Sequence, residues 1–277
     1  MLILEAYSVF RPCPTYTLHI QDSAGPWSYP EHTHRGFGDL LVVERGRIRQ
    51  RVNGHDLQLA AGEAILVRPS DRHALDGEGF RFHNLNLPVG EFTRLATYAG
   101  DDLPLAGLLT ARQPPRARFA VADRQRILAD LAELTAHQGG PGSRALLGRF
   151  LLRWLPAFLG QAAGAPAGAG PPWLDPLLRR IEDGVARGLV VTDLPRLAGV
   201  SQAHLSRSFR RHVGTSPSQH LNRVRLHHAA LELARSERPV LDIGFGLGFA
   251  SPSYFYRLFA RAYGLPPAAY RRRHRMP

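Results

Sequence analysis

Residues 254–259 read Tyr-Phe-Tyr-Arg-Leu-Phe, and they repeat the pattern His-Leu-Ser-Arg-Ser-Phe of residues 204–209 at an offset of 50 residues. The same offset relates two glycines, at 214 and 264, and two prolines, at 217 and 267. Each copy has apolar or aromatic residues four positions apart, an arginine between them, a glycine stop and a proline beyond it. A repeat of this length indicates a duplicated supersecondary unit.

The sequence before each repeated pattern predicts a helix-turn-helix. In the first copy, a short helix over 192–198 precedes the turn Gly199-Val200-Ser201 and a second helix over 202–212. Glycine permits the tight turn, and Ser201 suits the N-cap of the second helix. The second helix of such a unit fits the major groove of DNA.

The second copy repeats this order, and a long helix over 218–235 joins the two copies. Its predicted parts are a helix over 240–246, a turn over 248–251 and a second helix over 252–263. The positions of both second helices that face away from the predicted core are expected to contact DNA: Ala203, Ser206, Arg207, Arg210, Pro252, Ser253, Tyr256, Arg257 and Arg261. Any one of these arginines, taken alone, is better interpreted as a solvated surface charge.

The charge of the chain is concentrated in the same region. The net charge is +12, and the residues from Trp173 onward carry 17 arginines but only seven acidic residues. Such a partition is typical of a domain that neutralises DNA phosphates. The partition, the repeat and the glycine turns together favour double-stranded DNA as the partner.

The 277 residues suffice for two domains that each bury a core. Residues 160–172, GQAAGAPAGAGPP, predict a linker between a domain over 1–160 and a DNA-binding domain over 173–277. The single cysteine, Cys13, excludes an intrachain disulfide and a cysteine-rich zinc site. We expect a cytoplasmic protein, because the sequence offers neither a secretory signal nor a stretch that would span a membrane.

The first domain begins with short apolar or alternating runs between about residues 16 and 90. Turn residues separate these runs, and Asn53-Gly54 is a strong hairpin signal. The spacing predicts a β-barrel or sandwich. Helical periodicity follows between about 123 and 159, where apolar residues form a wide stripe. These helices are expected either to pack on the barrel or to form the interface of a homodimer.

The C-terminal region resembles the AraC family of transcription regulators. The resemblance is carried by Ile243-Gly244, Gly248-Phe249, Ser253-Tyr254-Phe255, Arg257, Phe259, Gly264, Pro267 and Tyr270-Arg271. Gly244 stands where the family usually has alanine, and Pro252 and Ala260 also depart from its habits. The resemblance implies recognition helices in two successive major grooves, contacts with RNA polymerase, and activation of transcription more often than repression.

The N-terminal region resembles the cupins. His32, His34, Asp39 and Gly46 resemble the first cupin motif, and Gly62, Pro69 and His73 resemble the second. Asp39 replaces the usual glutamate. His32, His34, Asp39 and His73 are therefore candidate ligands of a divalent metal such as Zn²⁺ or Fe²⁺. They are also candidates for a metal-free pocket that binds a sugar or an acid, or for groups that satisfy one another.

The expected fold is multidomain α and β: an N-terminal cupin-like β-barrel with a following helical segment, and a C-terminal all-α double helix-turn-helix. The expected function is a DNA-binding transcription regulator controlled by a small effector bound in the barrel. The alternatives are a metal-dependent cupin enzyme fused to a DNA-binding domain, and an interaction module without a ligand. Fusion to DNA-binding helices favours sensing, so we do not expect an enzyme.

Overall fold

The computed structural model describes residues 2–5, 15–69, 71–99, 106–162 and 170–274. The chain divides into two compact units. Unit 1 comprises Met1–Leu108 and Pro114–Ala163, and unit 2 comprises Leu109–Gln113 and Gly164–Pro277. Of the predicted linker over 160–172, the first residues belong to a helix that ends at Ala162, and residues 163–169 lie outside the described part.

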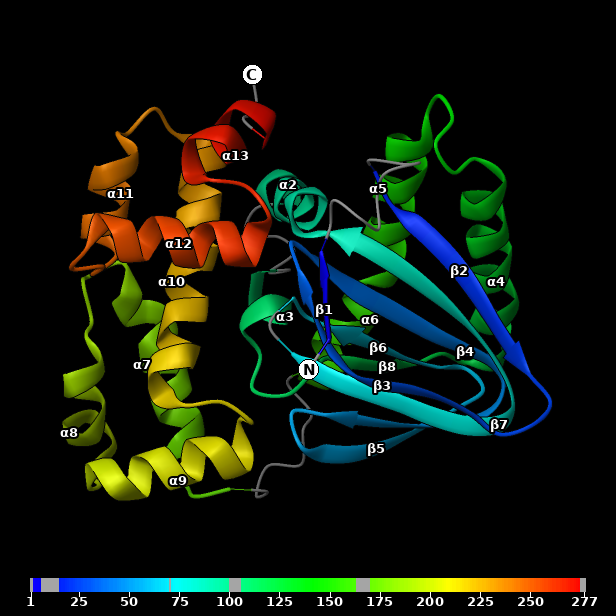
Figure 1. Cartoon of the computed structure of the whole chain (residues 1–277), viewed down its shortest axis with the longest axis horizontal. Helices are drawn as coiled ribbons and strands as arrows, with labels where there is room; N and C mark the ends of the chain where they lie inside the picture. Colours follow the sequence, from blue (N-terminus) through cyan, green and yellow to red (C-terminus); the bar gives the residue numbers. More distant parts are fainter. Residues whose placement is uncertain (1, 6–14, 70, 100–105, 163–169, 275–277) are drawn as a thin grey trace. The chain divides into compact units, whose positions relative to one another are not determined.

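Unit 1 is built on one eight-stranded sheet with the order β1-β3-β7-β4-β6-β8, in which β2 also pairs with β7 and β5 with β4 (Figure 1). Among the described strands, only the β1–β3 pair is parallel. The long, bent strands β4 and β7 form the spine of the sheet. The strands are β1 (Leu2–Glu5), β2 (Thr17–Ser23), β3 (Trp27–Arg35), β4 (Phe37–Val52), β5 (His55–Ala60), β6 (Glu63–Val67), β7 (Arg72–Pro88) and β8 (Arg116–Arg118).

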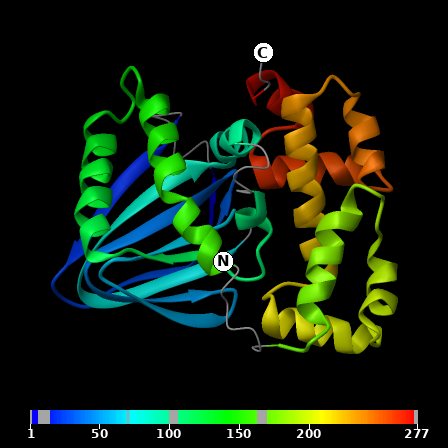
Figure 2. The same cartoon turned by 180° about the vertical axis from the view of Figure 1, so that it is seen from behind.

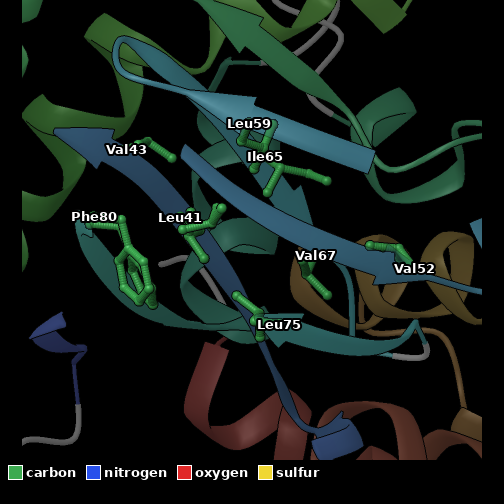
Figure 3. Close-up of a cluster of buried hydrophobic side chains, with 10 residues drawn as sticks. Leu41, Val43, Val52, Leu59, Ile65, Val67, Leu75 and Phe80 are labelled. Atoms are coloured by element: carbon green, nitrogen blue, oxygen red, sulfur yellow. The ribbon is translucent and has the colours of Figure 1, made fainter. Parts of the chain in front are cut away.

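The predicted hairpin turn joins β4 to β5. Asn53 has a φ of 50° and Gly54 a φ of 83°. Positive φ at both central residues is what a two-residue turn of type I′ requires. Alternation along β4 then turns Ile48 and Val52 toward the core and the arginines between them toward solvent. Ile48 and Val52 belong to one buried apolar cluster of the sheet, which is shown in Figure 3.

Four helices of the described chain accompany this sheet in unit 1: α2 (Val89–Ala99), α4 (Val121–Ala136), α5 (Ser143–Trp154) and α6 (Pro156–Ala162). The short helix α3 (Ala106–Thr110) begins in unit 1 and ends in unit 2. Figure 2 shows α4 and α5 side by side against the sheet. Leu151 is 1% exposed and Phe158 is 0% exposed, and the Phe158 ring contacts Phe119 at the end of β8. These two side chains are therefore core, which confirms the packing alternative for them and excludes them as dimer contacts.

Unit 2 is helical. Its elements are α7 (Leu174–Val185), η1 (Val191–Asp193), α8 (Leu194–Ala198), α9 (Gln202–His212), α10 (Pro217–Arg235), α11 (Val240–Gly246), α12 (Pro252–Tyr263) and α13 (Pro267–His274). The long helix α10 runs between the half that contains α9 and the half that contains α12 (Figure 1). Ser216 and Gln219 close its N-terminus with a reciprocal capping box.

Within the described ranges, no helix combines the length and the apolar character needed to cross a membrane.

Candidate DNA interface and sensor site

The first helix-turn-helix consists of α8, the turn at Gly199 and α9. Gly199 has a φ of 67°. Glycine adopts this conformation without the steric cost of a Cβ atom. The Ser201 hydroxyl accepts a hydrogen bond from the backbone N–H of His204 at 3.2 Å and so caps α9. Leu205 and Phe209 are buried beneath the helix. Of the predicted DNA contacts on α9, Ala203, Arg207 and Arg210 are exposed and Ser206 is half-buried.

The second helix-turn-helix consists of α11, the turn at Gly248 and α12. The Ser251 hydroxyl accepts a hydrogen bond from the backbone N–H of Tyr254 at 3.4 Å, and Pro252 occupies the first helical turn. Phe255 and Phe259 are buried. Of the predicted contacts on α12, Pro252, Ser253, Arg257 and Arg261 are exposed, whereas Tyr256 is half-buried.

The structure brings together the four candidate ligands of unit 1. His32 and His34 lie on β3, Asp39 on β4 and His73 on β7, and all four are buried. Each offers one ligand atom, and these atoms all lie within 4.8 Å of one another. His34 Nε2 lies 3.3 Å from Asp39 Oδ2 and 3.4 Å from His73 Nε2. Strand register explains the approach of His32 and His73, which pair directly between β3 and β7.

A second layer of polar groups orients these side chains. His32 Nδ1 is hydrogen-bonded to the Pro30 carbonyl at 2.9 Å, which makes that nitrogen the donor. The two oxygens of Asp39 accept hydrogen bonds from the amides of Asn86 at 2.6 Å and Asn84 at 3.1 Å. Such outer contacts fix the orientation of metal ligands in proteins.

The protonation of the cluster suits a cation. Burial, together with the neighbouring His34 and His32, holds the pKa of His73 well below its usual value. Burial also lowers the pKa of His32, although the Pro30 carbonyl opposes this shift. Neutral imidazoles keep a nitrogen lone pair for a metal.

A neighbouring amide completes the surroundings of His73. His73 Nδ1 lies 2.9 Å from Gln50 Nε2, and Gln50 Oε1 is buried without a hydrogen-bond partner in the described part. Turning this amide over would let Oε1 accept a hydrogen bond from Nδ1–H and free Nε2 of His73 for a metal. The donor set therefore fits a metal ion.

Comparisons with known proteins agree with both halves of this description. A helix-turn-helix domain family matches residues 194–273, and a cupin domain family matches residues 19–82. The HTH-type transcriptional activator RhaS of Klebsiella pneumoniae is 27% identical over an alignment of 277 positions that covers 96% of each protein. These matches bear out the resemblance to the AraC family of transcription regulators.

Two further comparisons concern a relative that matches part of the chain and a solved structure. The HTH-type transcriptional regulator GlxA of Rhizobium meliloti is 38% identical over 106 residues, which are 38% of this chain and 33% of that protein. Among solved structures, apo ToxT from Vibrio cholerae covers 94% of this chain and 98% of its own, with 13% identity and a TM-score of 0.44. The resemblance to the AraC family rests on the sequence matches.

The structure also contains features that sequence reasoning missed. Tyr254 entered only as part of the family signature, yet its side chain is 38% exposed on α12 and lies beside Arg257. Its position three residues before Arg257 was the available signal, because residues three apart are neighbours on a helix.

Unit 1 contains a second feature that the sequence did not indicate, an open hollow of about 680 Å³. It is lined by Pro26, Trp27, Ser28, Arg47, Ile48, Arg49, Gln58, Asp76, Gly77 and Glu78. None of the four cluster residues lines it.

Proposed function

We propose that this AraC-family regulator activates transcription in the cytoplasm by placing α9 and α12 in two successive major grooves of duplex DNA. The observation that carries the proposal is the pair of capped helices that expose Arg207 and Arg257 at equivalent positions of the repeat. Relatives such as RhaS are named transcriptional activators, which supports activation rather than repression. An activator must engage RNA polymerase, which we propose as its protein partner.

The test is selection of duplexes from a random-sequence library by the full chain. Enriched duplexes should contain two protected grooves about 34 Å apart, one turn of DNA. Affinity should fall steeply with salt, because bound arginines release counterions from the phosphates. Arg126→Ala on α4 removes the same charge from unit 1 and serves as the control for Arg207→Ala and Arg257→Ala. A footprint confined to one groove would contradict the two-helix proposal.

For unit 1, we propose that His32, His34, Asp39 and His73 hold a divalent first-row metal ion. The ligand atoms lie too close together for an organic effector to fit among them, whereas imidazole and carboxylate are ligands that such ions prefer. When bound, the ion would tie β3, β4 and β7 together at one point. The side chains themselves keep the donor atoms converged through Pro30, Asn84 and Asn86.

Metal analysis of the purified full chain tests this site. We expect one ion per chain, loss of the ion in His34→Ala, and retention of DNA binding by unit 2 in that variant. His137→Ala replaces an exposed histidine next to α4 and should leave the metal content unchanged. Metal-free protein with unaltered stability in His34→Ala would make the cluster a structural hydrogen-bond network.

The open hollow supports a small polar effector as the signal. Arg49 and Asp76 pair there at 2.6 Å, and Arg47 and Glu78 lie on neighbouring strands. A ligand with both donors and acceptors would meet guanidinium and carboxylate groups on one wall. Effector response should be lost in Asp76→Ala while DNA binding remains. Turnover of a candidate ligand by the metal-loaded full chain would instead favour the enzyme alternative.

We also propose that the chain forms homodimers through the exposed side of α4 and α5. Leu152 on α5 is 39% exposed, whereas its neighbour Leu151 is buried. Leu152 is therefore the apolar side chain of α5 that a partner chain could cover. Leu152→Glu should convert dimers into folded monomers in sedimentation experiments. A wild-type chain that is monomeric at micromolar concentration would contradict the proposal.

A further inference from the structure

Tyr254 stands between the recognition-helix arginine Arg257 and the long helix α10. The Arg257 guanidinium carbon lies 5.5 Å from the centre of the Tyr254 ring. This separation is within the range of a cation–π contact. The Tyr254 hydroxyl accepts a hydrogen bond from Asn222 Nδ2 on α10 at 3.1 Å. The ring that supports the arginine is thus itself held at its far end.

Arg225, one turn along α10 from Asn222, joins this pair to both halves of unit 2. Its side chain is buried, and its Nη2 donates to the Leu189 carbonyl at 2.8 Å, between α7 and η1. Its guanidinium also lies 5.4 Å from the centre of the Phe249 ring in the second turn. Burial lowers the pKa of the guanidinium, and the neighbouring Tyr254 opposes that shift.

The turn of the second helix-turn-helix is shaped to admit Arg225. Gly248 has a φ of +83°, and a Cβ atom at this position would lie 2.7 Å from Arg225 Nη2. Arg225 Nη1 reaches Asn222 Oδ1 at 3.5 Å, so the two α10 side chains that face the second copy also meet each other. A polar chain therefore runs from Leu189 through Arg225 and Asn222 to Tyr254.

We propose that Asn222 and Tyr254 are positioning residues that hold the Arg257 guanidinium for base contact, and that Arg225 fixes this assembly to the first half of unit 2. Immobilising a long, rotamer-rich side chain opposes binding, so an arginine that is already oriented loses less freedom on contact. The inference rests on the proposed function, since it refines how α12 meets DNA.

The first copy lacks this arrangement and supplies the internal control. The counterpart of Tyr254 is His204, whose ring contacts Trp173 with centroids 5.7 Å apart. In the described part of the chain, Arg207 makes no ion pair, hydrogen bond or ring contact. Positioning through α10 is therefore expected for α12 and not for α9.

The experiment is a double-mutant cycle in the full chain, measured on the duplex enriched from the random library. Tyr254→Leu should weaken binding about twofold to fivefold, the range of an exposed cation–π contact. Asn222→Ala and Tyr254→Phe, which keeps the ring, should each weaken it about twofold. In an Arg257→Ala background all three effects should disappear, because the side chain that they position is absent.

The same variants should lose discrimination only at base pairs in the groove of α12, with thermal stability unchanged. His204→Leu, the matched control, should leave that groove unaffected. Arg225→Lys should tolerate duplexes in which the two half-sites are one base pair closer or further apart, which the wild-type chain rejects. Arg225→Met repeats this spacing test if the lysine retains the Leu189 contact.

Two kinds of failure are distinguishable. If the wild-type chain enriches no duplex, the proposed function and the positioning inference both fall. If it enriches one, but the effects of Tyr254→Leu and Arg257→Ala add, or both grooves lose discrimination equally, only the positioning inference is overturned.

Discussion

The two helix-turn-helix copies share their architecture but are embedded differently. Both recognition helices are capped by a serine hydroxyl and anchored by a buried phenylalanine, at Phe209 and Phe259. Phe209 contacts the ring of His220 on α10. Phe259 instead belongs to an aromatic stack with Tyr263 and Tyr270, at centroid distances of 4.5 and 5.2 Å.

The aromatic second core explains the departure at position 244. A Cβ atom on Gly244 would lie 2.9 Å from the Phe255 ring, so the ring fills the space that alanine would take. The missing methyl group therefore leaves no gap in α11. The duplicated units thus keep the scaffold while the residues around it diverge. The second copy has more aromatic contacts, and the ring of Tyr254 lies against its Arg257.

The largest expected difference concerns the two anchors. Phe209→Ala and Phe259→Ala should each lower the free energy of unfolding by about 3–5 kcal/mol, because each leaves a cavity in a closed core. Phe259→Ala is expected at the upper end, since it removes three ring contacts, with Phe255, Tyr263 and Tyr270, whereas Phe209→Ala removes one. Such contacts are worth roughly 0.5–1.5 kcal/mol each. Urea unfolding of the full chain measures both, with the half-exposed Phe245→Ala as the control. Equal losses would mean that the aromatic stack adds nothing beyond burial.

His227 lies on α10, which both copies share, and it predicts acid sensitivity. The side chain is 3% exposed, and neither ring nitrogen has a hydrogen-bond partner in the described part. Burial, with His228 and Arg235, lowers its pKa to about 3. The folded state thus keeps His227 neutral, whereas the unfolded chain binds a proton below about pH 6.5. Stability is complete above that pH and falls by about 1.4 kcal/mol per unit as the pH drops toward 3.

His227→Met should remove this dependence and stabilise the chain at neutral pH, because two buried polar atoms disappear. Thermal unfolding between pH 7 and 4 measures the slope. The exposed His137→Met next to α4 is the control and should leave the slope unchanged. An unaltered acid slope in His227→Met would show that other groups cause it.

Much of the fold was predictable because its signals are local. The repeat predicted both helix-turn-helix units, and Asn53-Gly54 predicted the β4–β5 hairpin that the structure contains. The wide apolar stripe of α5 and α6 left two alternatives open, because periodicity reports that a face is covered but not by what. Burial of Leu151 and the packing of Phe158 on Phe119 make these two side chains core, whereas the dimer interface stays a prediction.

The sites were predictable only where a motif carried them. The resemblance to cupin motifs indicated His32, His34, Asp39 and His73, and the structure places them together. The amides that orient Asp39 come from Asn84 and Asn86, far along the chain, and depend on the register of β4 against β7. The Asn222–Tyr254 bond likewise joins two different helices, so tertiary packing had to be known first.

Two arginine variants compare what each copy contributes to DNA binding. Arg207→Ala and Arg257→Ala should each cost about 1–3 kcal/mol of binding free energy if the side chain reads a base edge. Each variant should lose discrimination only at base pairs in one groove, and the affected groove should be a different one for each variant. Binding to single-substitution duplexes measures this. A uniform loss over all sequences would make that arginine a phosphate contact.

The smallest expected difference lies in the two helix caps. Ser201→Ala and Ser251→Ala each remove a hydroxyl that accepts a backbone N–H, and such losses cost about 1 kcal/mol. Ser201→Ala should cost more, because α12 keeps Pro252, whose fixed φ already favours the first turn and whose missing N–H needs no acceptor. The free energy of unfolding of both variants decides this, and Pro252→Ala in the Ser251→Ala background tests the reason. If Ser251→Ala is the costlier change, Pro252 does not compensate for the lost hydroxyl at the start of α12.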